Sequence, residues 1–243
     1  MSSFKDYFIQ MVPIIFISMP FVLVHRILEI KKRKYKEIKT SKYRELGVIA
    51  LMYSLIFIIT VTIGISIFFM NVQYISENIH YSIESINLIP FKGILDTPLL
   101  DGLNISAHNL VNFFGNVSMF IPLGFCTALL SQKEKRKKNT ILTGVVVSIS
   151  VEIIQIFAIR SLDINDIILN ILGALLGLKL LNLLEKPLPN FFYKFHSQKT
   201  VKELSLKEKL KANIITILQI AVWIIMIVNL KQMIKVFDNI FHI

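Results

Sequence analysis

The chain has almost no cysteine. Its 243 residues include only Cys126, which excludes an intramolecular disulfide and any redox framework built on cysteine pairs. Cys126 lies in an apolar run, where a thiol behaves as a small hydrophobic side chain. Cysteine and histidine spacings typical of zinc are also missing, since His80 and His108 occur without further ligands nearby. We therefore expect neither a metal nor a cofactor.

Charged residues are scarce, and acidic ones most of all. They make up 18% of the chain against 54% hydrophobic residues, which excludes an ordinary soluble domain. Asp and Glu number 16 against 27 Lys and Arg, for a net charge of +11. The basic residues fall between apolar runs, so we expect anionic lipid headgroups on the cytoplasmic side as partners, and no nucleic acid.

Long apolar runs are what the chain does contain. Each is close to the roughly 20 residues that cross a hydrocarbon core of about 30 Å. They predict an all-α fold, a polytopic membrane bundle of about six transmembrane helices. The first is too long for the apolar part of a signal peptide, and basic residues follow it, so we expect a retained helix. The runs are residues 7–28, 46–70, 110–130, 140–158, 166–184 and 214–233.

The runs divide the chain into four predicted segments. These are an N-terminal two-helix segment at 1–70, a central membrane domain at 71–184, a basic cytoplasmic connection at 185–213 and a final membrane helix at 214–243. The central domain opens with an extracytoplasmic loop at 71–109. In this loop Ile75, Ile79, Ile83 and Ile86 recur at helical spacing, which predicts an interfacial amphipathic helix.

The distribution of Lys and Arg predicts the orientation. Residues 26–45, 132–139 and 185–213 hold nine, five and seven of them, whereas the alternate connections and the termini hold five. Because basic loops stay inside, both termini are expected to be extracytoplasmic, in a multi-pass protein of the bacterial cytoplasmic membrane.

Polar residues concentrate between 151 and 177. An uncompensated charge deep in a membrane helix costs roughly 2.5 to 3.5 kcal/mol, so Glu152 is expected to face protein or a wet cavity. At 1.5 Å per residue, Asn116, Glu152 and Asn170 all lie about 9 to 10 Å below the outer helix ends. Helical spacing also groups Asn112 with Asn116, Glu152 with Gln155, and Asp163 with Asp166 and Asn170. We expect these groups to line an outward-facing polar pocket.

Small residues and prolines predict packing and turns. Gly173 and Gly177 form a G-x-x-x-G motif, which lets another helix approach closely. Structural kinks or ligand contacts are both open for Gly115, Pro122 and Gly124. Pro90 and Phe91 close an extended turn that begins at Asn87.

Arg160 has two interpretations. In the first, it pairs with Asp163 and Asp166, and Asp163 caps the following helix. In the second, it binds an anionic phosphate or carboxylate, with Glu152 acting as an acid or base below it.

With these residues in view, the chain resembles the VanZ-like family of bacterial membrane proteins. The resemblance covers roughly residues 85–184 and rests on four motifs in order. They are N-L-I-P-F at 87–91, G-N-x-x-x-F-I-P-L-G-F at 115–125, E-I-I-Q at 152–155 and R-S-L-D-I-N-D-I-I-L-N-I-L-G-A-L-L-G at 160–177. It implies a cell-envelope membrane protein, since the family is named for a member linked to teicoplanin resistance.

Three functions follow from these observations. The first is envelope protection, in which the polar pocket binds a lipid-linked precursor, a glycopeptide or another anionic ligand through Asn87, Asn112, Asn116, Gln155, Arg160 and Asn170. The second is a membrane enzyme for a lipid-linked substrate, with Glu152 as acid or base and Asp163 or Asp166 orienting it. The third is a small transporter, which needs a polar path continuing to the inside.

Overall fold

The computed structural model describes residues 4–35, 41–63, 72–92, 107–195 and 205–241. The residues outside the described ranges include 64–70 of the second apolar run, 71 and 93–106 of the predicted extracytoplasmic loop, and 196–204 of the basic connection.

The described residues are almost entirely helical and contain no β-strand. Six of their helices are long and apolar enough to cross a membrane, so the predicted all-α bundle with six spans is confirmed, and the protein is a multi-pass membrane protein. The spans are Val12–Lys34, Lys42–Thr62, Asn112–Leu130, Lys133–Phe157, Ile164–Glu185 and Leu206–Val236.

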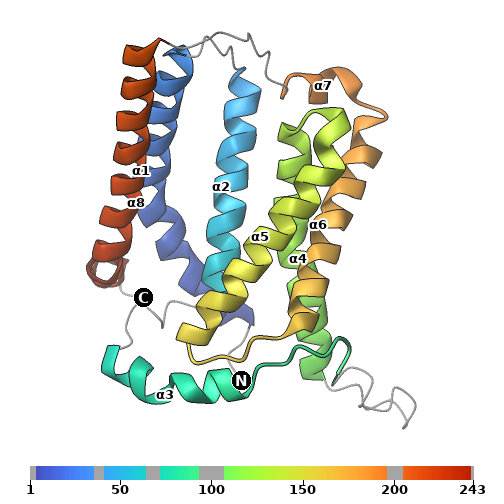
Figure 1. Ribbon diagram of the computed structural model, residues 1–243, viewed down its shortest axis with the longest axis vertical. Coiled ribbons are helices and arrows are strands. Elements are labelled where there is room, and N and C mark those ends of the chain that lie inside the picture. The colour runs from blue at the N-terminus through green and yellow to red at the C-terminus, as the bar shows by residue number, and fades with distance from the viewer. Residues whose placement is uncertain (1–3, 36–40, 64–71, 93–106, 196–204, 242–243) are drawn as a thin grey trace. The chain divides into compact units, whose positions relative to one another are not determined.

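The chain forms two compact units, residues 1–56 with 190–243, and residues 57–189. The first contains α1 (Phe4–Tyr35), the first part of α2 (Lys42–Ile63), the end of α7 (Pro189–Tyr193) and α8 (Leu206–Phe241). Helix α1 runs beside α8 and continues through both of its prolines (Figure 1).

Polar bonds join the helices of the first unit at one end. The indole of Trp223 on α8 donates to His25 on α1 at 3.1 Å, and the amide of Gln219 donates to Glu29 at 3.0 Å. Glu45 on α2 accepts from both Arg26 and Arg33. These bonds compensate part of the basic charge between the first two spans.

The second unit contains the end of α2, α3 (Val72–Glu84), α4 (Ala107–Leu130), η2 (Lys133–Lys135), α5 (Arg136–Phe157) and α6 (Ile164–Glu185). Helix α6 packs against both α4 and α5, and α3 lies across the end where α5 turns into α6 (Figure 1). In α3, Ile75 and Ile79 are half-buried and Ser82 is buried, whereas Ile83 faces outward. The amphipathic helix therefore forms with a buried face narrower than the isoleucine pattern.

Helix α5 has a polar inner face and an apolar outer face. Its buried side at four-residue spacing is Arg136, Thr140, Gly144, Ser148 and Glu152. Its exposed side carries Leu142, Val146, Ile149 and Ile153. Exposed apolar side chains along a whole helix are suited to lipid, and small or polar side chains are suited to close contact between membrane helices.

Glycines bring α4 and α6 together. A Cβ added at Gly173 would overlap the carbonyl of Val117, one at Gly177 would overlap the carbonyl of Ile121, and one at Gly124 would overlap the carbonyl of Ala174. By contrast, a Cβ at Gly115 would meet no atom within 4 Å. Pro122 is exposed, and α4 continues through it without a break.

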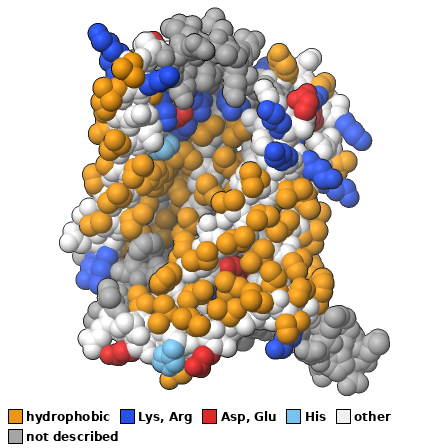
Figure 2. Space-filling view, in the orientation of Figure 1, with side chains coloured by type: hydrophobic (Ala, Val, Ile, Leu, Met, Phe, Trp, Pro, Cys, Tyr) orange, Lys and Arg blue, Asp and Glu red, His pale blue; other side chains and the backbone are white. Residues whose placement is uncertain are grey.

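Lys and Arg side chains gather at the end of the second unit where α5 begins and α6 ends (Figure 2). Here α5 starts at Arg136, one turn before the predicted Thr140. The hydropathy signal stops short because it counts Arg136 as unfavourable. In the fold this buried guanidinium forms a two-nitrogen ion pair with Glu185 at the end of α6.

Candidate functional site

The N-L-I-P-F turn docks onto the connection between α5 and α6. The backbone N–H of Asn87 donates to the carbonyl of Leu162 at 2.9 Å, and the carbonyl of Asn87 accepts from the N–H of Ile164 at 2.9 Å. Together they form an isolated parallel bridge between Asn87 and Asp163. Backbone hydrogen bonds therefore join the N-L-I-P-F motif to the motif at 160–177, although more than 70 residues separate them in sequence.

Asp163 is the centre of this junction. Its Oδ1 accepts from the backbone N–H of Asn165 at 2.8 Å and caps α6, which satisfies one of the unpaired amides at a helix start. The same oxygen accepts from the side-chain amide of Asn87 at 3.0 Å. The capping part of the first interpretation of Arg160 is confirmed, while the pairing of Arg160 with aspartate is not observed.

Glu152 lies directly beneath the junction. Its side chain is almost fully buried, with 1% of the residue exposed, and its Oε2 accepts from the backbone N–H of Asp163 at 3.0 Å. It faces protein, as expected from the cost of placing a charge in lipid. This hydrogen bond links α5 to the N-cap residue of α6, and it therefore stabilises the connection between the two helices.

Asn165 was not singled out by sequence reasoning, yet it is buried and joins the two segments. Its Oδ1 accepts from the backbone N–H of Phe91 at 2.6 Å, and its amide donates to the carbonyl of Lys92 at 3.0 Å. Phe91 adopts a φ of 65°, uncommon for a residue other than glycine. The available signal was an asparagine in the first turn of a helix, where its side chain can bond to neighbouring backbone.

The end of α5 turns sharply and places Arg160. Ile159 has a φ of 55°, and the N–H of Arg160 donates back to the carbonyl of Gln155 at 3.0 Å, as in the left-handed C-caps usually formed by glycine. A β-branched residue in this conformation is strained, by roughly 1 to 3 kcal/mol. This conformation ends α5 just before Arg160.

Arg160 is exposed and anchored at one nitrogen. Its Nη1 donates to the carbonyl of Thr62 at 2.6 Å, and the amide of Gln155 donates to the same oxygen at 3.2 Å. Thr62 is in the last turn of α2, where carbonyls lack helical partners and attract a cation. Within the described residues, no ion pair joins Arg160 to a carboxylate.

Two further polar pairs lie deeper between the helices. Asn116 on α4 donates to Oδ1 of Asp166 on α6 at 2.5 Å. Asn170, with 2% of its surface exposed, donates to the hydroxyl of Ser148 on α5 at 2.9 Å, and its own Oδ1 has no hydrogen-bond partner among the described residues.

The predicted site residues thus fall into three groups. We name the first group the polar cluster, and it consists of the predicted Asn87, Asn116, Glu152, Asp163 and Asp166, together with Asn165, which was not predicted. The second is Gln155 with Arg160 on the carbonyl of Thr62. Asn170 stands apart with Ser148, and Asn112 is exposed at the start of its span. The catalytic and ligand-binding roles of all these residues stay predictions.

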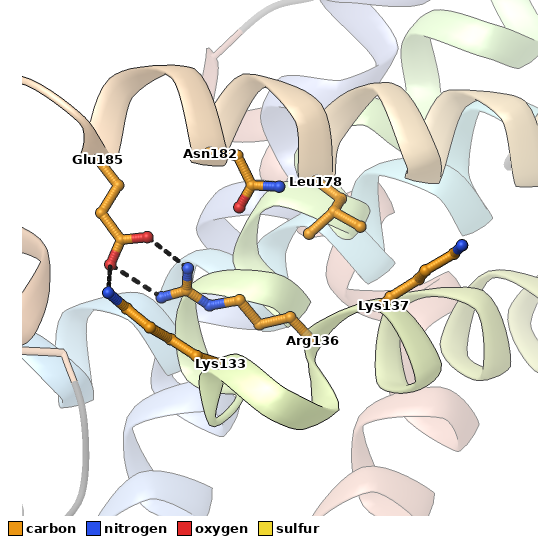
Figure 3. A pocket seen from close by; sticks show the side chains of 6 residues that line it. All are labelled: Lys133, Arg136, Lys137, Leu178, Asn182 and Glu185. Atoms are coloured by element: carbon orange, nitrogen blue, oxygen red, sulfur yellow. Dashed lines mark hydrogen bonds and ion pairs between the residues drawn. The ribbon is translucent and has the colours of Figure 1, made fainter.

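No three His, Cys, Asp or Glu side chains of the described residues are placed to hold a metal ion. A surface pocket of about 380 Å³ lies at the other end of the second unit, far along α5 and α6 from the polar cluster. Its walls are Lys133, Arg136, Lys137, Leu178, Asn182 and Glu185 (Figure 3).

Comparison with known proteins supports the resemblance seen in the sequence. A search of curated proteins finds no match, and a search of solved structures finds none. A model of the family described as VanZ/LLP1 matches residues 49–185, more than half of the chain, and this range includes the whole polar cluster and the pocket. The chain therefore belongs to the VanZ/LLP1 family.

Proposed function

We propose that this VanZ/LLP1-family protein resides in the bacterial cytoplasmic membrane and binds an anionic, lipid-linked envelope ligand through Arg160, beside the polar cluster. We further propose that this binding lowers the effect of teicoplanin-type glycopeptides. The first proposal rests on the chemistry of Arg160, and the second rests on the first and on the association that the family name carries.

The observation that carries the proposal is an exposed guanidinium on a rigid support. Arginine has five N–H donors, and the bond to Thr62 occupies one of them. Glu152 and Asp166 attract this charge from a longer range, but neither carboxylate is within ion-pair distance of the guanidinium. Guanidinium groups with free donors are well suited to phosphate and carboxylate, which they bind through two parallel hydrogen bonds.

The polar cluster supplies the support. Asn87, Glu152 and Asp163 tie the turn before α6 to the N-L-I-P-F turn, and the α5 C-cap fixes the backbone of Arg160. A pre-organised cation loses less freedom when it binds a ligand than a lysine on a mobile loop would.

The position of Arg160 indicates an amphipathic ligand. It lies between the span that ends at Phe157 and the span that begins at Ile164, so it is at a membrane surface. In the adjoining turn, Leu88, Ile89 and Phe91 are 66%, 60% and 50% exposed. A ligand with a phosphate and an acyl or isoprenoid chain would satisfy both features.

The enzyme hypothesis uses the same residues in different roles. It requires Glu152 to reach a substrate, and a carboxylate that is buried and bonded to the N–H of Asp163 is better placed to hold the backbone. For the transporter hypothesis, the buried polar row on α5 is interrupted at Gly144, where a Cβ would lie 3.2 Å from that of Ala174. The binding function is therefore the one that we develop.

The test is a lipid pull-down with the full-length protein. Purified wild type, Arg160→Gln and Lys92→Gln are incubated with a bacterial lipid extract, and retained lipids are identified by mass spectrometry. Lys92 is the matched control because it is a second exposed cation at the same end of the unit. We expect a phosphate-bearing lipid that is retained by wild type and Lys92→Gln and is at least tenfold depleted in Arg160→Gln.

Equal retention by all three proteins would contradict the binding proposal. The resistance proposal has its own readout, the teicoplanin susceptibility of cells with the gene deleted and then restored as wild type or Arg160→Gln. Unchanged susceptibility on deletion would reject resistance while leaving ligand binding intact.

A further inference from the structure

The pocket between α5 and α6 has a fixed floor. Arg136 has 6% of its side chain exposed and binds both carboxylate oxygens of Glu185, one of them at 3.2 Å. The ammonium of Lys133 lies 3.6 Å from the same carboxylate. Figure 3 shows Lys133 from η2 and Arg136 from the start of α5 converging on Glu185, with Asn182 one turn earlier on α6.

The residues that line the pocket carry a net positive charge. Three cations and one carboxylate line the pocket: Lys133 and Arg136 point toward Glu185, whereas Lys137 points away from it (Figure 3). The side chain of Lys133 is 66% exposed, so its contact with Glu185 is largely screened by solvent. No carboxylate of the described residues is within ion-pair distance of Lys137. The pocket therefore favours an anion, and Asn182 adds a neutral amide donor beside it.

The position of the pocket relative to the membrane indicates which kind of anion it can bind. Lys133 is the first residue of one span and Glu185 is the last residue of the next, so the pocket lies at the boundary between hydrocarbon and water. Leu178, which lines the pocket, is half-buried and one turn deeper than Asn182. On α5, Ile141 follows Lys137 by one turn and is also half-buried. On both helices, therefore, a half-buried apolar side chain lies one turn deeper in the span than a polar residue of the pocket.

We propose that this pocket binds the phosphate of an anionic membrane phospholipid. Lys133 and Lys137 contact the phosphate, the Arg136–Glu185 pair keeps the floor rigid, and the acyl chains follow Leu178 and Ile141. Arginine and lysine clusters at helix ends recognise lipid headgroups by this combination of charge and apolar surface. The proposal is independent of the function assigned to Arg160, because it uses different residues at the opposite end of the unit.

Native mass spectrometry of the full-length protein tests this site. The protein is purified in a neutral detergent and titrated with phosphatidylglycerol or phosphatidylcholine. The test variant is Lys133→Gln with Lys137→Gln, which spares the buried ion pair. The control is Lys138→Gln, an exposed neighbour that does not line the pocket and points about 100° away around the helix.

We expect phosphatidylglycerol to bind more tightly than phosphatidylcholine to wild type and to Lys138→Gln. Each lysine removed from the pocket should weaken phosphatidylglycerol binding about fivefold, so the double variant should lose more than tenfold. Thermal unfolding of the variants serves to confirm that each remains folded.

Two results would overturn the proposal. If Lys138→Gln weakens binding as much as the double variant does, the lipid is held by general surface charge. If inorganic phosphate at millimolar concentration displaces phosphatidylglycerol completely, the site takes free phosphate in preference to a lipid. A phospholipid site is supported if inorganic phosphate fails to displace phosphatidylglycerol and only the double variant loses phosphatidylglycerol binding.

Discussion

Asn87 and Asp163 lie 76 residues apart in sequence and are joined by a side-chain hydrogen bond of 3.0 Å and by a backbone bridge. Asp163 uses a single oxygen, Oδ1, both for this bond and for capping α6. One carboxylate oxygen thus orders a loop and starts a membrane helix, and the second oxygen takes no part in either task.

Substitution of Asp163 separates structure from chemistry. Asp163→Ala removes a helix cap and a side-chain hydrogen bond, each worth about 1 kcal/mol, so the apparent Tm in detergent should fall by several degrees. Asp163→Asn retains an oxygen in the position of Oδ1 and should unfold close to the wild-type temperature. Differential scanning fluorimetry in detergent measures both values.

The Asp163→Asn variant then decides whether charge matters. If ligand retention in the lipid pull-down is lost while the Tm is preserved, Asp163 contributes its charge or a proton to function. If Asp163→Asn is as unstable as Asp163→Ala, the carboxylate has structural partners beyond Asn87 and Asn165.

Glu152 offers a second comparison of charge with hydrogen bonding. Glu152→Ala leaves the backbone N–H of Asp163 without its acceptor, which costs about 1 to 3 kcal/mol for a buried group. Glu152→Gln keeps a side-chain oxygen that can accept this bond. It also replaces a carboxylate with a neutral amide, and burying a charged group in an apolar environment costs free energy. We expect Glu152→Ala to lower the apparent Tm and Glu152→Gln to preserve or raise it. If Glu152→Gln is as unstable as Glu152→Ala, the negative charge of Glu152, and not its hydrogen bond, stabilises the fold.

The contact between α4 and α6 predicts opposite effects for two glycines. Gly173→Ala places a methyl group against the carbonyl of Val117, and overpacking of this kind costs about 1 to 3 kcal/mol. Gly115→Ala places it in open space and improves the helix propensity of α4 by up to about 1 kcal/mol. Thermal unfolding in detergent should therefore show Gly173→Ala below wild type and Gly115→Ala at or above it. Equal apparent Tm values for the two variants would mean that α4 and α6 can move apart at Gly173 without a loss of stability.

The spans were predictable from the sequence because hydropathy is local. The run 110–130 and the span Asn112–Leu130 nearly coincide, since each residue contributes to the signal independently of its partners. Helix ends were less predictable, as the early start of α5 illustrates: Arg136 is buried there in an ion pair with Glu185, 49 residues later in the sequence.

The site was predictable in its membership but not in its pairings. Polar groups inside a membrane protein need partners, so the sequence could indicate that Glu152 and Asn170 face the interior. Their partners depend on the rotation of each helix about its axis. Glu152 binds the backbone of Asp163, and Asn170 binds Ser148, one helical turn before Glu152 on α5. The same holds for Arg160, whose partner is a carbonyl on α2.

Orientation in the membrane is the remaining prediction, and the single cysteine makes it testable. Replacing the buried Cys126 with Ala gives a cysteine-free protein, into which Ser161→Cys or Lys135→Cys is introduced. Both positions are exposed, one beside Arg160 and the other beside the pocket between α5 and α6. The excess of Lys and Arg predicts that the Lys135 end faces the cytoplasm.

In intact cells, a membrane-impermeant maleimide should label Ser161→Cys and should leave Lys135→Cys unlabelled until the membrane is permeabilised. Labelling of both after permeabilisation controls for access to the thiols. The reverse pattern in intact cells would place Arg160 and the polar cluster at the cytoplasmic surface. An extracellular glycopeptide could not then reach the cluster directly, so the ligand would have to be one available from inside, such as a membrane-bound precursor before its translocation.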